Sequence, residues 1–462
     1  MTRCRFGLRL GLATALIALA ASPSAMAAPQ AKPTPAGGNL FSFGQLQAQT
    51  VGAKGCGTNT DGEPSIHVSR DNDVFLGSER GVGSGSDLWR GLSTVGGSGA
   101  SGCSLEYRGQ PNGAGGVGAS GGDIDIALAP QRNALGHFNV YVASLNLGSI
   151  NVATSEDRGE TFSQTPVQAG IPVDDREWIA ASGASTSLLT YHDIPTDNID
   201  VLRSDDGGAL YTQVSRAIPD TDYKAMNNEL GNIVIDHRNT AGAAAGQFWA
   251  YQSFAAPHDA NDSNLDEAFL AVSNDGGSTW TDRAIPCSYE PGKNIAQNFP
   301  NVSVAPNGTL WYAWSDGAAI RTATSSDHGA TWTCSGPVSS GSPQAIFPWL
   351  VATSAGVDLV YYGADKTGPD QTWYADFAQN LKSTPKGWGS TTRITAVHAG
   401  EVCEGGISCT GGRQLLDDFG VDTDQSGWAH IAYSHDSPDL GGSGTYTGSA
   451  VQTGGTPAGY PN

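Results

Sequence analysis

Long hydrophobic runs are scarce in this sequence of 462 residues. After residue 27, no stretch supplies the roughly 18 apolar residues that a membrane-spanning helix needs. The one concentrated apolar run, residues 10–21, follows Arg3, Arg5 and Arg9 and precedes Ala25-Met26-Ala27. This arrangement is typical of a secretory signal peptide. The sequence therefore predicts a signal peptide over residues 1–27, a flexible leader over 28–38, and a secreted protein, either extracellular or periplasmic.

Positive charge is also scarce. The chain has 24 Lys and Arg against 45 Asp and Glu, which gives a net charge of −21. Nucleic acids and anionic membranes are bound through clustered basic residues. The charge balance therefore argues against both as partners, although it leaves room for one local basic pocket.

Zinc-site spacings are missing, because the sequence has no CxxC and no HxxxH pattern. Cys4 falls in the predicted signal peptide, which leaves six of the seven cysteines. An even number of cysteines in an exported protein indicates disulfides. We predict that sequence neighbours pair: Cys56 with Cys103, Cys287 with Cys334, and Cys403 with Cys409.

What the sequence does contain is a phrase that occurs four times. The copies are SEDRGETF (155–162), SDDGGALY (204–211), SNDGGSTW (273–280) and SSDHGATW (325–332). Each reads Ser-x-Asp-x-Gly-x-Thr-aromatic, except that Leu210 replaces threonine in the second copy. Repetition with a period near 50 residues is typical of solenoids and propellers. The 62 glycines and 14 tyrosines favour short strands joined by tight turns.

The segments around each copy predict a meander of four strands. In the clearest repeat, strands are expected at 299–306, 310–315 and 320–325, and the phrase forms the turn before a fourth strand. Equivalent units are predicted to begin at Glu63, Gly122, Asp175, Glu229, Asn298, Phe347 and Asp418. Seven units predict an all-β fold, a single β-propeller over residues 39–462, with six blades as the open alternative. We expect residues 45–51 to supply the fourth strand of the last blade.

The position of the phrase assigns it to one face of the propeller. If strand one runs from the top face to the bottom, the turn between strands three and four lies at the bottom. Its aspartate can accept backbone N–H bonds, its glycine can adopt positive φ, and its aromatic residue can pack between strands. A scaffold role therefore explains the repetition.

The four turns resemble the Asp-box, or BNR repeat, of the sialidase-like β-propeller superfamily. That resemblance implies an active site on the face opposite the turns and a glycoside hydrolase of the exo-sialidase type. Sialidases hold the carboxylate of their substrate with three arginines, whereas here only Arg176 and Arg80 are expected at the top face. An Arg-Ile-Pro motif near the first strand is also missing.

Charged residues recur where the inner strands enter from the predicted top face. A ring of carboxylates raises some pKa values by mutual repulsion, and general acid catalysis requires such a carboxyl group. The candidate catalytic residues are Asp123, Asp175, Glu63 and Asp418. The candidate substrate-binding residues are Arg176, Glu229, His192, Arg80 and His435.

These features predict a monomeric carbohydrate-active enzyme that acts on a carbohydrate or glycoconjugate and requires no cofactor. Glycoside hydrolysis needs two carboxyl groups in one site. Two other functions stay open: a non-catalytic propeller that binds glycan or protein, and a polysaccharide lyase.

Calcium is an additional candidate ligand of the acidic channel mouth. The segment DTDQSG (422–427) imitates the start of an EF-hand loop, but Tyr433 stands where that loop needs glutamate. We therefore predict that this segment is a turn between two strands.

Overall fold

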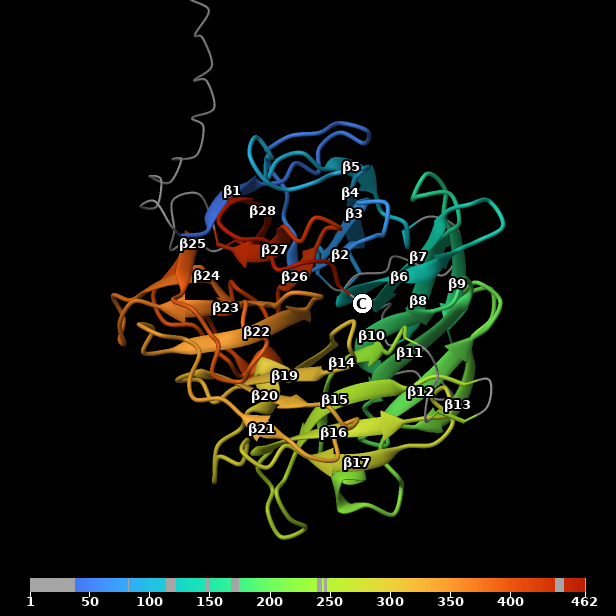
Figure 1. The fold of residues 1–462 in the computed structure, drawn as a ribbon, viewed down its shortest axis with the longest axis vertical. Coiled ribbons are helices and arrows are strands. Elements are labelled where there is room, and N and C mark those ends of the chain that lie inside the picture. The colour runs from blue at the N-terminus through green and yellow to red at the C-terminus, as the bar shows by residue number, and fades with distance from the viewer. Residues whose placement is uncertain are drawn as a thin grey trace, which may run out of the picture. The chain divides into compact units, whose positions relative to one another are not determined.

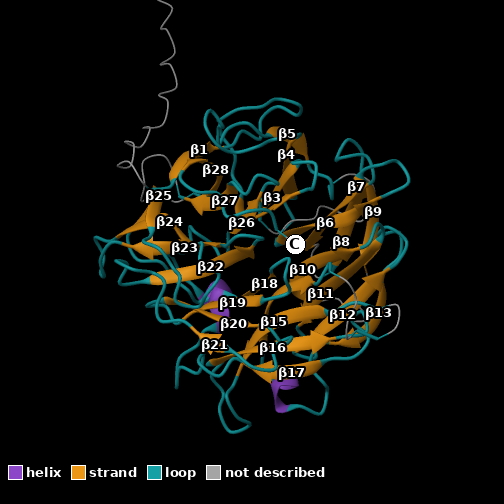
Figure 2. Ribbon diagram, viewed as in Figure 1, coloured by secondary structure: helices purple, strands orange, loops and turns teal. Residues whose placement is uncertain are grey.

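The structure is a computed structural model that describes residues 38–81, 83–113, 122–145, 149–167, 174–238, 243–244, 247–436 and 444–461. The predicted signal peptide and nearly all of the predicted leader lie outside these residues. Seven sheets of four antiparallel strands surround a common centre, which confirms the all-β propeller and settles the blade count at seven (Figure 1). Helix is limited to the short 3-10 turns η1 (Tyr223–Met226), η2 (Ala296–Asn298) and η3 (Gly406–Ser408) within the described residues (Figure 2).

The first four blades follow one another along the chain. Blade 1 contains β2 (Gly62–Val68), β3 (Val74–Glu79), β4 (Ser86–Gly91) and β5 (Glu106–Gly109). Blade 2 contains β6 (Ile124–Arg132), β7 (Phe138–Leu145), β8 (Ile150–Ser155) and β9 (Ser163–Val167). Blade 3 contains β10 (Asp174–Ser182), β11 (Thr186–Asp193), β12 (Asn198–Ser204) and β13 (Thr212–Arg216). Blade 4 contains β14 (Glu229–Ile235), β15 (Ala250–Ala256), β16 (Glu267–Ser273) and β17 (Thr281–Ala284).

Two more blades repeat this order, and the seventh closes the ring. Blade 5 contains β18 (Asn301–Val304), β19 (Leu310–Ser315), β20 (Ile320–Ser325) and β21 (Thr333–Cys334). Blade 6 contains β22 (Ala345–Ala352), β23 (Val357–Ala364), β24 (Thr372–Asn380) and β25 (Thr392–Ala399). Blade 7 contains β26 (Gly420–Thr423), β27 (Ala429–His435), β28 (Tyr446–Gly454) and the N-terminal strand β1 (Leu40–Gln45). Residues 424–428 connect β26 to β27, as predicted for DTDQSG.

The closing strand lies five residues earlier than expected. β1 pairs with β28 from Leu40↔Gly454 to Gln45↔Gly448, whereas the prediction placed this strand at residues 45–51. Phe41 and Phe43 pack against the main hydrophobic core, so this part of the segment takes the sheet position. Gln47 then ends the strand, because its side chain donates to the carbonyl of Ala53 at 2.6 Å and folds residues 47–53 into a loop.

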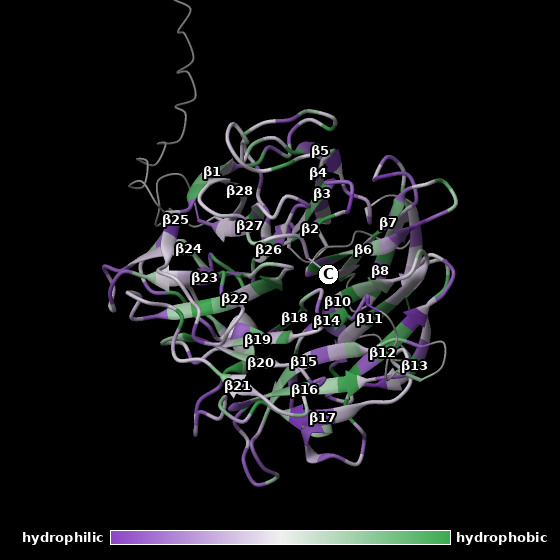
Figure 3. Cartoon of the chain, in the orientation of Figure 1, coloured by the Kyte–Doolittle hydropathy of each residue, from purple (hydrophilic) through white to green (hydrophobic). Residues whose placement is uncertain are grey.

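Side-chain hydrogen bonds connect the inner strands of neighbouring blades. The N–H groups of Val68, Ile179 and Val302 donate to side-chain oxygens of Asp422 (2.8 Å), Asp125 (2.9 Å) and Asn232 (2.8 Å) on the adjacent blade. An inner edge strand would otherwise expose unpaired backbone groups to the channel. Apolar side chains fill the space between blades, and hydrophobic colouring concentrates in strands such as β22 while many outer loops are hydrophilic (Figure 3).

The repeated phrases form the turns between strands three and four of blades 2 to 5. In the third copy, Asp275 accepts hydrogen bonds from the backbone of Ser278 (3.1 Å) and Thr279 (2.9 Å) and from the Thr279 hydroxyl (2.6 Å). Ser273 Oγ closes the turn by accepting from the Gly277 N–H at 2.9 Å. These bonds remain within the turn, at the end of the blade opposite the entrance of the inner strand, as the scaffold interpretation requires.

The three predicted disulfides are present. Cys56–Cys103, Cys287–Cys334 and Cys403–Cys409 have Cα separations of 5.0, 6.4 and 5.9 Å. Among the described residues, no helix has the length and apolar content required to cross a bilayer.

Candidate functional site at the channel mouth

The top entrances of several inner strands carry side chains on a left-handed backbone. Glu63, Arg176, Phe299 and Phe347 have φ values of 49°, 40°, 37° and 52°. The pairing register shifts beside Glu63, Arg176 and Phe347, as at a β-bulge. Such a conformation costs a non-glycine residue about 1–3 kcal/mol and gathers at functional sites, where bulges re-aim side chains.

Arg176 brings three of the four candidate catalytic carboxylates together. Its guanidinium lies 3.3 Å from Glu63 Oε2 and 3.4 Å from Asp123 Oδ1, and it pairs with Asp418. These residues come from the entrances of blades 3, 1, 2 and 7, so the site exists only in the closed ring. Arg176 is 3% exposed, which makes this a buried ionic cluster.

Aromatic rings support the Arg176 guanidinium from blades 3 and 5. The guanidinium carbon lies 4.1 Å from the Trp178 ring centre and 5.2 Å from that of Phe299. Trp178 is stacked on Trp349 of blade 6 at 5.1 Å. Cation–π attraction is strongest for desolvated cations, so this aromatic floor helps to retain the charge of Arg176 in a buried place.

The mouth holds a second arginine, Arg413, which the sequence did not predict. Arg413 Nη2 lies 3.6 Å from Glu63 Oε1 and also pairs with Asp417. It belongs to the irregular connection between β25 and β26, where strand alignment gives no position. Glu63 therefore bridges two arginines.

Burial and crowding raise the pKa values of the inner carboxyl groups. The pKa of Glu63 is raised well above its usual value by burial, by the charges of Asp123, Asp417 and Glu79, and by a hydrogen bond with Asp123. Burial likewise raises the pKa of Asp418 to about 7, although Arg176 opposes the shift. The mouth therefore holds several carboxyl groups whose pKa values are raised.

Asp175 and Asp123 form the accessible part of this group. The backbone N–H of Arg176 is shared by Asp123 Oδ2 and Asp175 Oδ1, each 3.0 Å away. Asp175 is exposed and the Asp123 side chain is 16% exposed, in contrast to buried Glu63. The protein around the Asp175 carboxyl group reduces its hydration and so raises its pKa, although part of the side chain is exposed, and the charge of Asp123 raises the pKa further.

His192 and Glu229 extend the site toward blade 4. His192 lies opposite Asp175 in the β10–β11 pairing, and its Nε2 is 3.4 Å from Asp197 Oδ1. Burial lowers the pKa of His192, but the bond to Asp197 and the charges of Glu229 and Asp175 outweigh it, so the pKa is raised. Burial also raises the pKa of Glu229 to about 7, against the opposing effect of His192.

Arg80 and His435 point to other parts of the top face. Arg80 Nε lies 3.9 Å from Asp61 Oδ1 in blade 1. The His435 ring lies 5.9 Å from Tyr433 and 5.7 Å from Tyr446, all three in blade 7. Of the five candidate binding residues, Arg176 is at the centre of the site, and His192 and Glu229 lie on the side of Asp175. Arg80 and His435 contact other residues of the top face.

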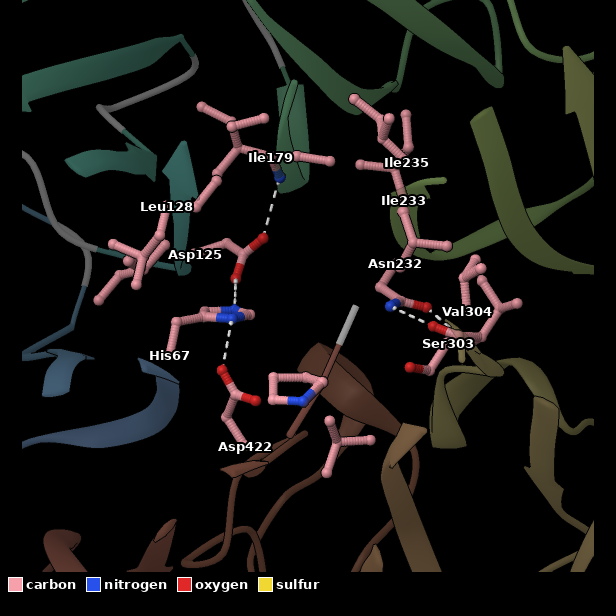
Figure 4. Close-up of a pocket in the computed structure, with 18 of the residues that line it drawn as sticks. His67, Asp125, Leu128, Ile179, Asn232, Ile233, Ile235, Ser303, Val304 and Asp422 are labelled. Atoms are coloured by element: carbon pink, nitrogen blue, oxygen red, sulfur yellow. Dashed lines mark hydrogen bonds and ion pairs between the residues drawn. The ribbon is translucent and has the colours of Figure 1, made fainter. Parts of the chain in front are cut away.

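Below the mouth, the inner strands of all seven blades enclose a cavity of about 190 Å³ (Figure 4). Its wall is mostly aliphatic, with residues such as Ile179, Ile233 and Val304. One side carries His67, whose ring nitrogens lie 3.6 Å from Asp422 and 4.0 Å from Asp125. Both carboxylates also accept backbone N–H bonds from the adjacent blade, so these residues stabilise the closed ring of blades.

No cluster of three or more His, Cys, Asp or Glu side chains in the described part of the chain has the arrangement of a metal site. The mouth carboxylates are instead compensated by Arg176 and Arg413.

No protein-family model matches the chain, and no curated protein matches it either. Solved propeller structures resemble it weakly. An α-L-arabinofuranosidase from Fusarium graminearum with an iminosugar inhibitor shares 12% identity at a TM-score of 0.45, covering 90% of this chain and 97% of that one. The GH74 xyloglucanase from Xanthomonas campestris shares 13% identity at 0.48, covering 86% of this chain and 53% of the other. A lectin from Aleuria aurantia shares 11% at 0.43, covering 74% and 97%. At these values, the likenesses carry no argument about function.

Proposed function

We propose that this protein is a secreted, carbohydrate-active propeller that hydrolyses glycosidic bonds at the channel mouth. The observation that carries this proposal is the sharing of one backbone N–H by Asp123 and Asp175. Glycoside hydrolysis uses one carboxylic acid with a raised pKa and one ionised carboxylate. Asp175 supplies the acid, because its pKa is raised and its side chain is accessible. The three disulfides fit an oxidising, extracellular setting.

In this assignment, Asp175 protonates the leaving oxygen, and Asp123, oriented by Arg176, is the second carboxyl group of the reaction. Glu63 and Asp418 are 3% and 5% exposed, and both contact Arg176. We assign them the role of holding Arg176 rather than of touching the substrate. His192 and Glu229 line the accessible side.

The substrate best matched to this mouth is a neutral glycan. Arg176 and Arg413 are both engaged by carboxylates, so neither offers a free guanidinium to an anionic sugar. The exo-sialidase reaction implied by the Asp-box resemblance needs such a free cationic clamp. Sialic acid is therefore the poorer candidate.

The test is release of reducing sugar from soluble arabinan, xyloglucan and galactomannan, with sialyllactose as the anionic comparison. We expect at least one neutral glycan to be cleaved, and both Asp175→Asn and Asp123→Asn to lower the rate at least 100-fold while the protein stays folded at the assay temperature. Asp205→Asn, an exposed aspartate in a bottom-face turn, is the matched control. Full activity in both mouth variants, or cleavage of sialyllactose alone, would overturn this assignment.

A non-catalytic glycan-binding propeller is the second candidate. It is favoured by the burial of Arg176 and Glu63, each 3% exposed, which is typical of a structural ionic cluster. It predicts that calorimetry detects binding of a neutral glycan that no incubation with the protein cleaves.

A further inference from the structure

Three aromatic rings are exposed on the top rim of blade 4. Tyr223 and Tyr289 are 37% and 39% exposed, and the side chain of His258 is 44% exposed. Tyr223 lies in η1 before β14, His258 follows β15, and Tyr289 lies between β17 and β18. All three connections leave the blade at the end where Glu229 enters, so the rings share the face of the channel mouth. We call these three residues the rim platform.

The rings of the rim platform are fixed in place although they are exposed. Tyr223 Oη donates to the carbonyls of Pro257 (3.1 Å) and His258 (2.9 Å), and Lys224 Nζ lies 4.8 Å from its ring centre. The His258 ring is stacked on Tyr289 with centroids 4.0 Å apart. A ligand that stacks on a fixed ring loses little conformational entropy in the protein.

Further contacts fix the loops that carry the rim platform. His258 Nδ1 lies 2.8 Å from Glu267 Oε2, and the Glu290 N–H donates to the Asp266 carbonyl at 2.9 Å. The disulfide Cys287–Cys334 anchors the chain two residues before Tyr289. These contacts connect three loops and explain the order of the rings, which remain partly exposed.

A chain of contacts links the rim platform to the candidate site. Asn228, next to Glu229 in sequence, donates from its side chain to the carbonyls of Lys224 (2.9 Å) and Asp197. The carboxylate of Asp197 in turn lies 3.4 Å from His192 Nε2. One chain of contacts therefore runs from Tyr223 to the side of the mouth where Asp175 is accessible.

We propose that the rim platform binds the apolar face of a pyranose ring in a neutral polysaccharide whose chain continues into the channel mouth. Sugar rings present C–H groups on one face and hydroxyls at their edges. Tyrosine and histidine rings suit the face. The accessible carboxylates of Asp259 and Asp262 lie near Tyr289, where they can accept from hydroxyls and repel anionic sugars. The proposal rests on the proposed function for the direction of the chain, but its binding test needs no catalysis.

The experiment is affinity electrophoresis in gels containing xyloglucan, galactomannan or arabinan, with polygalacturonate as the anionic probe. We expect at least one neutral polysaccharide to retard the protein, and Tyr289→Ala and Tyr223→Ala each to weaken that retardation at least fivefold. Tyr460→Ala is the matched control, because Tyr460 is 48% exposed and bonds the bottom-face residue Ser354. Melting temperatures verify that each variant is folded.

Three outcomes contradict the rim platform: no neutral polysaccharide retards the protein, the platform variants behave like Tyr460→Ala, or polygalacturonate binds as well as the neutral glycans. Failure of hydrolysis with binding intact would remove the enzyme assignment and leave the platform standing. Conversely, cleavage of a short aryl glycoside with unchanged KM in Tyr289→Ala, together with no polysaccharide retardation, would keep the enzyme and reject the platform.

Discussion

Arg176 Nη1 lies 3.3 Å from Glu63 Oε2, across 113 residues of chain. The contact joins blade 3 to blade 1, while Asp123 and Asp418 join blades 2 and 7 to the same guanidinium. Arg176 therefore lies at the centre of the candidate site and also connects four blades of the ring.

Replacing Arg176 by methionine should destabilise the propeller by about 3–5 kcal/mol, because it leaves buried carboxyl groups without their cation. Arg132→Met is the matched control. Arg132 forms an exposed ion pair with Asp71, so its replacement should cost far less stability. Chemical denaturation of both variants measures the difference. If both variants lost the same free energy of unfolding, Arg176 would not have a dominant role in holding the blades together.

The second bottom-face turn offers a stabilising substitution. Asp206 accepts from the backbone of Ala209 and Leu210 at 3.1 Å, but Leu210 has no hydroxyl to match the 2.6 Å bond from Thr279 to Asp275. Leu210 is also 63% exposed. Leu210→Thr should stabilise the fold by about 1 kcal/mol through the added bond, and Thr279→Leu should destabilise it similarly. A lower melting temperature for Leu210→Thr would show that its side chain has a role of its own.

Asp358 should make stability depend on pH. It is fully buried, and burial raises its pKa to about 7 despite the hydrogen bond from Gln379. A raised folded-state pKa gives stability that is complete below the unfolded value of 3.8 and is lost as pH rises through 7.

Asp358→Asn removes this titration, so the variant should gain stability relative to the native protein by roughly 3 kcal/mol between pH 5 and pH 8. Denaturant titrations of both proteins at each pH give the difference. Asp205→Asn, an exposed carboxylate in a turn, should leave the profile unchanged. Parallel profiles for the Asp358 variant and the native protein would rule out Asp358 as the titrating group.

The three disulfides should stabilise the fold by different amounts, according to the length of the loop that each one closes. Cys56–Cys103 and Cys287–Cys334 each span 47 residues, whereas Cys403–Cys409 spans 6. Loop-closure entropy predicts losses of about 4 kcal/mol for each long loop and about 2 kcal/mol for the short one. Double serine variants compared by denaturation test this order. A larger loss from the 403–409 pair would indicate that its loop has a structural role beyond entropy.

The strand order could be predicted because apolar runs and the repeated turns recur in register. EPSIHV, DIDIAL and EWIAAS all became inner strands, and the charged residues before them converged as expected. The bulges at Glu63 and Arg176 have no comparable sequence signal, since neither residue favours positive φ.

Loop residues escaped prediction for a different reason. Arg413 and Tyr289 lie in irregular connections, where neither period two nor the repeat fixes a direction for the side chain. Arg413 reaches Glu63 only because the connection before β26 folds over the mouth. The sequence also could not predict that Asp123 and Asp175 lie side by side, because their arrangement depends on one shared backbone N–H.

The pairing of β1 with β28 also has a consequence for biosynthesis. Asn39 accepts a hydrogen bond from Gln452, 413 residues further along the chain. At translation rates of about 5–20 residues per second, the first strand is made tens of seconds before its partner. During that interval the Phe41 and Phe43 side chains have no sheet to join, so the newly made chain must keep an unpaired strand from aggregating until the last blade arrives.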